Sequence, residues 1–400
     1  MSRGKGQAAT GAPDYAPPEG LVRVQRGALI VGGAALALSI LGGLADPVQF
    51  FRSYLVAFVY WLSIALGCFA ISMLHHLSRG AWGLMIRRVL EAASRTLPVL
   101  ALLFLPLLFG LRTLYHWARP EEVRADPLLQ HQALYLNVPF FVGRAALYFA
   151  VWWVFAFAID RLSRRQDETG DARLARRLQV CSAPGLALYC LTASFAAIDW
   201  LMSLDSRWSS TIYGFYFVGG QALSALAFVI LVALFLSRRE PMSEVFRPAH
   251  FHDYGKLLLT FVVLWAYFNV SQLIIIWQGN LAEEMTWYQG RLLGGWRWVS
   301  LLLAVLHFAL PFVLLLSRDL KRDVGRLAGI AALLLVMRWV DLFWLAAPAF
   351  SPDHVTLHWL DATTPVALGG LWIAAFAAEL RKRPLLPLRD PFLAEALGHG

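Results

Sequence analysis

Long apolar runs separated by short polar segments recur along almost the whole chain. A helix needs about 20 mostly apolar residues to cross roughly 30 Å of hydrocarbon. Ten runs approach or meet this length, and they cover residues 27–45, 53–77, 97–114, 138–160, 180–201, 212–236, 257–279, 298–317, 324–346 and 364–380. Membrane-spanning strands would instead alternate apolar and polar positions. The pattern therefore predicts an all-α polytopic membrane protein with about ten transmembrane helices.

Composition agrees with this prediction. The chain has 400 residues, of which 58% are hydrophobic and 15% charged, whereas an average soluble domain is about half apolar and about a quarter charged. These values exclude a soluble globular enzyme, a disordered chain and a coiled coil.

The chain has a net charge of +9, and its basic residues are unevenly distributed along the sequence. If the N-terminus is cytoplasmic, 26 of the 35 Lys and Arg residues lie in cytoplasmic segments and only seven in the opposite loops. Basic residues accumulate in the cytoplasmic loops of membrane proteins. The charge thus predicts that both termini are cytoplasmic, and it does not indicate a nucleic-acid partner.

The regions outside the ten runs predict the organisation of the rest of the chain. Residues 1–26 begin with a Gly-, Ala- and Pro-rich stretch and predict a disordered cytoplasmic tail, residues 27–380 form the membrane domain, and residues 381–400 form a cytoplasmic C-terminal tail. The loop over residues 115–137 has room for a small amphipathic element and is a candidate docking surface.

Cofactor motifs are missing from the sequence. Cys68, Cys181 and Cys190 have no CxxC spacing, so they predict neither a zinc or iron–sulfur site nor haem attachment. His354 and His358, like the His250–Asp253 segment, lack a third ligand, and we predict no metal site. Nucleotide-binding glycine motifs are also missing. Redox cofactors would have to belong to partner subunits.

Polar side chains inside the predicted spans are the candidate functional residues, because a charge at the bilayer centre costs roughly 2.5–3.5 kcal/mol. A candidate proton relay consists of His75, His76, Asp160, Asn269, Gln272, His307, Arg338 and Asp341. A candidate quinone or polar pocket consists of Arg144, Asp199 and Asp205. A quinone carbonyl needs a hydrogen-bond donor, and quinol oxidation needs a base that takes a proton.

Each of these residues also has a structural explanation that stays open. Arg338 and Asp341 are three residues apart and can neutralise each other. Arg144 can form a buried salt bridge to Asp199 or to another acid. His307, Asn269 and Gln272 can join helices by hydrogen bonds, and His75 and His76 can be interfacial.

Two sequence blocks resemble a known family. The first runs from Ala197 to Gly214 and contains Asp199-Trp-Leu-Met-Ser-Leu, followed by Asp205; the second runs from Arg247 to Lys256 and contains His250, His252 and Asp253-Tyr-Gly-Lys256, followed by Tyr267 and Gln272. These blocks resemble the ActF family, integral-membrane subunits of the bacterial alternative complex III that belong with the NrfD/PsrC-like membrane subunits. The likeness extends over roughly residues 45–380.

The resemblance implies two four-helix bundles, spans two to five (about 53–201) and spans six to nine (about 212–346), with spans one and ten peripheral. It also implies the bacterial inner membrane as the location. The implied partners are an ActC-like membrane subunit, iron–sulfur and haem c subunits that carry the electrons, and a terminal oxidase.

We therefore expect a membrane subunit of a quinol:cytochrome c oxidoreductase, without a cofactor of its own, that scaffolds the complex and relays protons or contacts quinone. Two alternatives remain. One is a secondary transporter for a small solute, since ten spans and buried charges suit that class. The other is the quinol-oxidising NrfD-type subunit itself, with Arg144 and Asp199 at its pocket.

Overall fold

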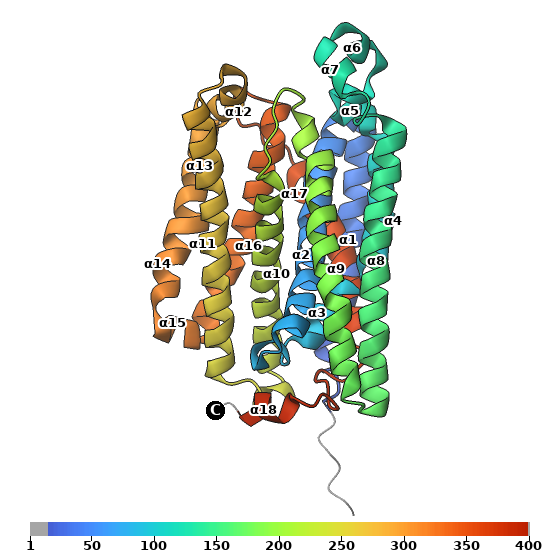
Figure 1. Cartoon of the computed structure of the whole chain (residues 1–400), viewed down its shortest axis with the longest axis vertical. Coiled ribbons are helices and arrows are strands. Elements are labelled where there is room, and N and C mark those ends of the chain that lie inside the picture. Colours follow the sequence, from blue (N-terminus) through green and yellow to red (C-terminus); the bar gives the residue numbers. More distant parts are fainter. Residues whose placement is uncertain (1–14, 399–400) are drawn as a thin grey trace, which may run out of the picture.

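The computed structural model describes residues 15–398, and the elements in that range are helical (Figure 1). The long helices are α1 (Gly20–Ala45), α2 (Pro47–Ser78), α3 with α4 (Arg87–Ser94 and Leu97–Phe109), α8 (Val138–Thr169), α9 (Arg173–Trp200), α10 (Tyr213–Ser237), α11 (Pro248–Gly279), the continuous α13–η5–α14 (Trp296–Leu302, Leu303–Ala309 and Leu310–Leu316), α16 (Val324–Ala346) and α17 (Leu360–Leu380). The short ones are η1 (Ala81–Gly83), α5 (Leu111–Leu114), η2 (His116–Ala118), α6 (Pro120–Ala125), α7 (Pro127–Gln132), η3 (Met202–Leu204), η4 (Met242–Glu244), α12 (Ala282–Leu292), α15 (Arg318–Arg322), η6 (Ala347–Ala349) and α18 (Leu393–Gly398).

Ten helical segments in residues 15–398 are long and apolar enough to cross a membrane, and they coincide with the ten predicted spans. The protein is therefore a polytopic helical membrane protein. Local sequence sets several helix starts: the Asp46 carboxylate accepts the Gln49 N–H at 3.0 Å and Pro47 follows it, and Asn137 caps α8 in the same way.

Several helices extend beyond the predicted spans: α8 ends at Thr169 rather than at residue 160, α9 begins at Arg173 rather than at residue 180, and α11 begins at Pro248 rather than at residue 257. Residues 20–26, predicted as part of the tail, are helical, because α1 continues past the apolar run into its basic first turns. Residues 1–14 of that predicted tail lie outside the described residues. The third span begins with α3 at Arg87 rather than at residue 97, because the charged side chains of α3 have buried partners.

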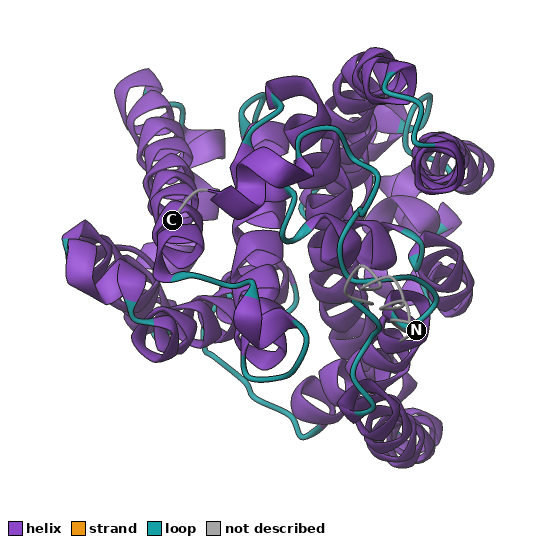
Figure 2. Ribbon diagram, turned by 90° about the horizontal axis from the view of Figure 1, so that it is seen from below, coloured by secondary structure: helices purple, strands orange, loops and turns teal. Residues whose placement is uncertain are grey.

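The helices form two four-membered bundles, as the sequence resemblance implied. In the first bundle, α2 packs on α4 and α9, and α8 packs on α4 and α9. In the second bundle, α10 packs on α11 and α16, while η5 and α14 pack against α11 and η5 packs against α16. The bundles meet along α2 and α10, which are the two most deeply buried spans. Figure 2 shows the packed helices along the bundle axis.

Helices α1 and α17 lie outside the two bundles and pack along each other, and α17 also packs on α2. Small residues allow the close approach of α1 and α17. A Cβ at Gly32 would lie 2.8 Å from the Gly370 Cα, so no larger side chain fits there without moving a helix.

The first described residue and the last ones lie at the same end of the bundle, which we call the terminal face. The Leu385 N–H donates to the Tyr15 carbonyl oxygen at 2.8 Å, and Leu385, Leu386 and Leu393 are buried. The segment predicted as a C-terminal tail is thus packed under the bundle and ends in α18 (Figure 1).

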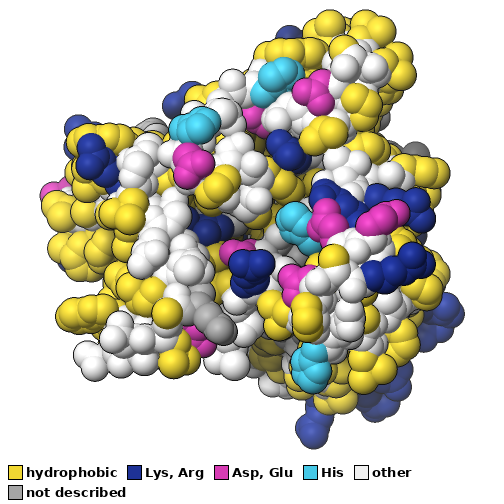
Figure 3. Space-filling model, turned by 90° about the horizontal axis from the view of Figure 1, so that it is seen from above, with side chains coloured by type: hydrophobic (Ala, Val, Ile, Leu, Met, Phe, Trp, Pro, Cys, Tyr) yellow, Lys and Arg dark blue, Asp and Glu magenta, His cyan; other side chains and the backbone are white. Residues whose placement is uncertain are grey.

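The other end of the bundle, the opposite face, carries the excursion α5–α7 and the short helix α12 (Figure 1). The loop predicted to hold a small amphipathic element contains η2, α6 and α7. Seen from above, this face carries acidic, basic and histidine side chains around hollows in its surface (Figure 3).

Candidate functional site

Polar side chains inside the bundle gather in three places. The second-bundle cluster comprises Tyr216, Trp265, His307, Arg338 and Asp341. The first-bundle ion pair comprises Arg144 and Asp199. The terminal-face network comprises Arg87, Arg88, Glu91, Arg95, Asp160, Ser163, Gln166, Asp167, Glu379, Arg383 and Asp390.

The second-bundle cluster joins three helices around one carboxylate. Arg338 and Asp341 form the predicted ion pair on α16, and both side chains are fully buried. Tyr216 of α10 donates its hydroxyl to Asp341 Oδ1. Trp265 of α11 donates its indole N–H to Asp341 Oδ2 at 3.2 Å. The carboxylate therefore has donors on both oxygens, as a charge away from water requires.

His307 adds a second ionisable group to this cluster. Its ring centroid lies 4.2 Å from that of Trp265, and the residue is fully buried. Neither ring nitrogen has a hydrogen-bond partner within residues 15–398, so the interhelical bridge considered for His307 is not formed there. His307 lies in η5, a π-helical turn, and such turns are frequent at functional sites.

The Arg338 guanidinium is only partly satisfied. Its Nη1 contacts Asp341, whereas Nε and Nη2 have no hydrogen-bond partner in the described part of the chain. The glycine at 220 on α10 makes room for this group, because a Cβ there would overlap the guanidinium. Two buried residues thus present unpaired polar nitrogens in the core of one bundle, an arrangement that costs free energy unless it has a further partner or a function.

In contrast to the Arg338 guanidinium, the two side chains of the first-bundle ion pair have all their hydrogen-bond partners. Arg144 Nε and Nη2 donate to the two Asp199 oxygens at 2.8 and 2.9 Å, and Tyr148 donates to the same carboxylate at 2.8 Å. Arg144 Nη1 donates to the Tyr135 carbonyl at 2.8 Å. This geometry confirms the salt bridge considered for Arg144.

The terminal-face network contains Asp160, which contacts Arg95, Arg164 and Arg383 at 3.0, 2.8 and 2.6 Å. It lies on α8 in the first bundle, whereas His307 lies in the second. Around it, Glu91 binds Arg87 and Arg88, and Asp390 of the C-terminal segment binds Arg87 at 2.7 Å. The network therefore fastens α3, α8, α17 and the C-terminal segment together.

His75 and His76 lie near this network at the end of α2. His75 packs edge-on against Trp82, with ring centroids 5.5 Å apart. His75 and His76 line a small cavity of about 30 Å³ together with Asp390. Nδ1 of His75 and Nε2 of His76 have no hydrogen-bond partner in the described range. Both histidines are buried among protein side chains.

The remaining predicted residues lie toward the opposite face. Asn269 is one turn from Trp265 and donates to its carbonyl oxygen at 3.1 Å, so it lies beside the second-bundle cluster. Gln272 accepts a hydrogen bond from Ser210 at 3.3 Å. The structure thus places His307, Arg338, Asp341 and Asn269 together, while Gln272, which is also buried, contacts Ser210 in the loop that precedes α10.

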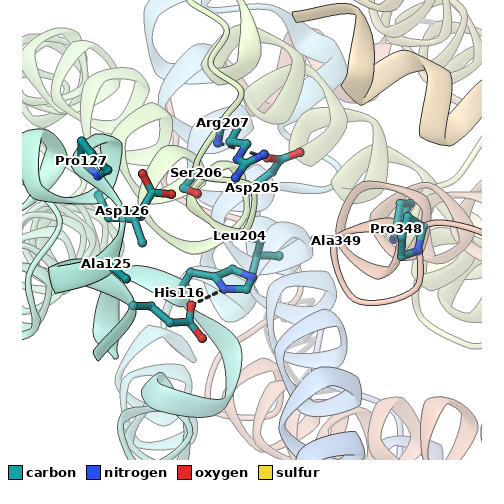
Figure 4. A pocket seen from close by; sticks show the side chains of 13 residues that line it. His116, Ala125, Asp126, Pro127, Leu204, Asp205, Ser206, Arg207, Pro348 and Ala349 are labelled. Atoms are coloured by element: carbon teal, nitrogen blue, oxygen red, sulfur yellow. Dashed lines mark hydrogen bonds and ion pairs between the residues drawn. The ribbon is translucent and has the colours of Figure 1, made fainter. Parts of the chain in front are cut away.

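Asp205 lies apart from Arg144 and Asp199, in a cleft of about 830 Å³ between the α6–α7 excursion and the loops at 204–207 and 348–352 (Figure 4). Its carboxylate accepts the Arg207 N–H at 3.2 Å and so shapes the loop. Across the cleft His116 bonds to Glu122 at 2.6 Å, and the hydrogen bond from Arg119 is the largest cause that lowers the pKa of Glu122.

The second sequence block has mainly structural contacts. His250 Nδ1 accepts the Arg247 N–H at 3.1 Å at the start of α11, and a Cβ at Gly255 would collide with Lys321. Asp253 and Lys256 form an exposed ion pair at 2.9 Å, and Tyr267 is 61% exposed on the outer surface of the bundle.

Several residues of these sites escaped the sequence reasoning. In the sequence, Tyr216 and Tyr148 are ordinary aromatic residues of a span, and Trp265 stands only among the residues that follow the second resemblance block. Their contacts with buried carboxylates distinguish all three. Arg87, Arg88 and Arg95 precede the predicted third span and belong to the 26 basic residues assigned to cytoplasmic segments, yet Arg87 and Arg88 are buried. The run of basic residues with Glu91 at helical spacing was the available signal for an ion-pair network.

Among residues 15–398, no three His, Cys, Asp or Glu side chains gather in a way that could hold a metal ion. In comparisons with known proteins, the sequence matches no family model and no curated protein.

Proposed function

We propose that this chain is a membrane subunit of a quinol:electron-acceptor oxidoreductase of the alternative complex III type, and that it scaffolds the complex and relays protons through its second bundle. The observation that carries the proposal is the second-bundle cluster: Arg338, Asp341 and His307 are fully buried where the surroundings are hydrocarbon. The sequence blocks that resemble ActF support the choice of complex.

The cluster has the parts that a proton relay needs. A neutral imidazole carries its proton on one ring nitrogen and accepts one on the other. His307 keeps both nitrogens free of hydrogen-bond partners in the described chain, and Trp265 contacts both the His307 ring and the Asp341 carboxylate. Arg338 favours the charged carboxylate beside it.

Quinol oxidation releases a pair of electrons and a pair of protons. In the proposed complex the electrons pass to haem c and iron–sulfur groups of partner subunits and then to a cytochrome c or a terminal oxidase. Asp341 and His307 hold and pass protons at carboxylate and imidazole atoms. The first-bundle ion pair has its donors and acceptors occupied, and we therefore assign it a structural role.

The proposed location is the bacterial inner membrane with both termini in the cytoplasm. Tyr15 and the segment around Leu385 lie at one face, and the loops that connect the spans at that face carry the predicted excess of basic residues. The opposite face, with the α5–α7 excursion, would then meet the electron-carrying subunits.

The test uses the intact complex in liposomes. His307→Ala and Asp341→Asn should each lower the number of protons moved per quinol oxidised, while subunit composition stays the same. His354→Ala and Asp253→Asn change the same residue types at exposed positions and serve as matched controls. Unchanged proton stoichiometry in both cluster variants would remove the relay from the proposal.

Liposomes also test the alternative function, a secondary transporter. Solute uptake by the chain alone in liposomes, abolished by the same two substitutions, would favour transport over the redox complex.

A further inference from the structure

The hairpin of α8 and α9 carries a dense group of basic side chains at the terminal face. The two helices pack along each other at one edge of the molecule, and a short turn at Gly170, whose backbone is left-handed, ends α8 (Figure 1). The exposed arginines near this turn are Arg161, Arg164, Arg165, Arg173, Arg176 and Arg177.

Most of these guanidinium groups have no acidic partner. Arg164 binds Asp160 at 2.8 Å. The other side chains form no ion pair or hydrogen bond with residues 15–398, and we call them the hairpin arginines: Arg161, Arg165, Arg173, Arg176 and Arg177. Arg389 of the C-terminal segment adds a further positive charge, because it donates to the Glu168 carbonyl oxygen. The hairpin therefore presents an uncompensated positive charge.

On α8 the hairpin arginines continue a face that is apolar closer to the membrane centre. Trp153, Phe157, Arg161 and Arg165 follow one another at steps of four residues and so share one side of the helix. Trp153 and Phe157 are both about half exposed, and their ring centroids lie 5.8 Å apart. In a membrane this side of α8 faces lipid.

The exposed side of α9 has the same order of side chains. Arg173 and Arg177 are followed by Val180, which is 63% exposed, and by the exposed Leu188. All four residues are separated by whole or nearly whole turns and therefore share one side of the helix. Each helix of the hairpin thus changes from arginine to apolar side chains along its exposed surface.

This change occurs at a similar depth on the two helices. A rise of about 1.5 Å per residue puts Arg161 about 14 Å and Arg177 about 10 Å from the turn at Gly170. The next exposed positions toward the membrane centre are Phe157 and Val180. Because both helices are long and apolar enough to span a membrane, this depth corresponds to the boundary between lipid headgroups and hydrocarbon.

We propose that the hairpin arginines bind the headgroup of an anionic phospholipid with two phosphates, of the cardiolipin type. Guanidinium groups bind phosphate oxygens in a bidentate manner. Packed helices lie about 8–10 Å apart, so a phosphate at the α8 arginines and another at the α9 arginines can belong to one lipid. Its acyl chains would then lie along Phe157 and Val180.

The acidic residues of the hairpin agree with this placement. Glu168 and Asp171 are exposed beside Gly170, at the aqueous tip of the turn, and so lie on the far side of the arginines from the hydrocarbon. The continuity of the arginines with two apolar helix faces favours a lipid over the acidic surface of a soluble protein. This lipid site depends on the spans and their charges, and not on the proposed function.

The test is native mass spectrometry of the full chain in detergent, with cardiolipin or with phosphatidylcholine of the same acyl chains added. We expect cardiolipin to bind about tenfold more tightly or better. Arg161→Gln combined with Arg177→Gln should weaken cardiolipin binding about thirtyfold, because each basic side chain near an anionic membrane surface contributes about a factor of five.

The matched control removes the same charge from another loop of the terminal face. Arg318→Gln combined with Arg322→Gln changes exposed arginines of α15, where Asp319 and Asp323 lie next to them in the sequence. This variant should bind cardiolipin as the wild type does. Equal binding of the two lipids by the wild type, or an equal loss in both double variants, overturns the proposal.

Pyrophosphate distinguishes a lipid from a soluble anion, because it supplies two phosphates without acyl chains. If pyrophosphate displaces cardiolipin at equal concentration, the surface binds a soluble anion and the proposal is wrong. A soluble protein is distinguished by the reaction of the hairpin arginines with phenylglyoxal in nanodiscs. Protection by the soluble subunits of the native complex, without protection by cardiolipin, overturns the lipid site.

A second measurement needs no variant and applies if the double variant fails to insert. Cardiolipin with a photoreactive acyl chain, in nanodiscs with the wild-type chain, should label the segments 153–161 and 177–188. Label confined to other spans contradicts the site.

The proposed function is tested separately by co-purification with redox subunits, which this site does not require.

Discussion

Trp265 donates its indole N–H to the buried Asp341 carboxylate at 3.2 Å, across the interface between α11 and α16. This bond connects an aromatic wall at the lipid side of the second bundle with an ion pair in its core. We expect Trp265→Phe to keep the ring packing and to remove about 1.5–3 kcal/mol of stability, because a buried carboxylate loses a donor. Unfolding by titration with a denaturing detergent measures this loss of stability. Trp298→Phe, at a 61% exposed tryptophan, is the control; equal loss in both variants would contradict the role of the bond.

Gly220 provides the space that Arg338 occupies. Gly220→Ala should displace the guanidinium from Asp341 and cost about 1–3 kcal/mol, as overpacking of a core does. Gly329→Ala lies on the same helix as Arg338, and its Cβ would meet nothing within 4 Å, so it should leave stability unchanged or slightly raised. Thermal unfolding of the two variants measures these stabilities. If Gly220→Ala unfolds at the same temperature as the wild type, Arg338 does not pack closely against Gly220.

The first-bundle ion pair should behave as a structural unit. Asp199→Ala leaves the Arg144 guanidinium without its carboxylate and should cost about 3–5 kcal/mol. Replacing both residues by Leu should cost less than this single change. Asp253→Ala breaks an exposed pair with Lys256 and should cost about 0–1 kcal/mol. Chemical unfolding of the single and double variants gives the change in the free energy of unfolding for each. If the effects of the two single substitutions simply add in the double variant, Arg144 and Asp199 are not coupled.

Asp390 fastens the C-terminal segment to the bundle through Arg87 and Gln166. Asp390→Ala should loosen residues 381–398 and raise the rate of trypsin cleavage after Lys382, while the ion pairs Arg88–Asp167 and Arg95–Asp160 hold α3 on α8. Glu395→Ala changes an exposed acid in the same segment and should leave the rate unchanged. Equal cleavage in wild type and Asp390→Ala would contradict the docking contact.

The sequence predicted the ten spans because their apolar length is a local property that the bilayer requires directly. It also offered the pair Arg338–Asp341, and a pair of Arg144 with Asp199 or another acid, as structural alternatives, since an unpaired charge in hydrocarbon is costly; the structure contains both pairs. It missed Tyr216 and Trp265, because which aromatic ring points at a carboxylate depends on how helices far apart in sequence pack.

The structure of the predicted C-terminal tail also depends on contacts between residues far apart in the sequence. Residues 381–398 are polar enough to suggest a free tail, yet Leu385, Leu386 and Leu393 are buried and Asp390 meets Arg87 on α3. Those contacts span some 300 positions in the chain, and local composition carries no information about them. The positions of Asp205 and Asp160 likewise depend on loop and helix packing.

The most direct test of the account is purification of the tagged chain from native membranes, followed by absorption and electron paramagnetic resonance spectra and a quinol:cytochrome c assay. We predict that it co-purifies with c-type haem and iron–sulfur subunits and with inhibitor-sensitive quinol oxidation, and that the spectra vanish when the chain is isolated from its partners. A chain that purifies alone, without redox centres or quinol oxidation, and that moves a solute across liposomes would contradict it.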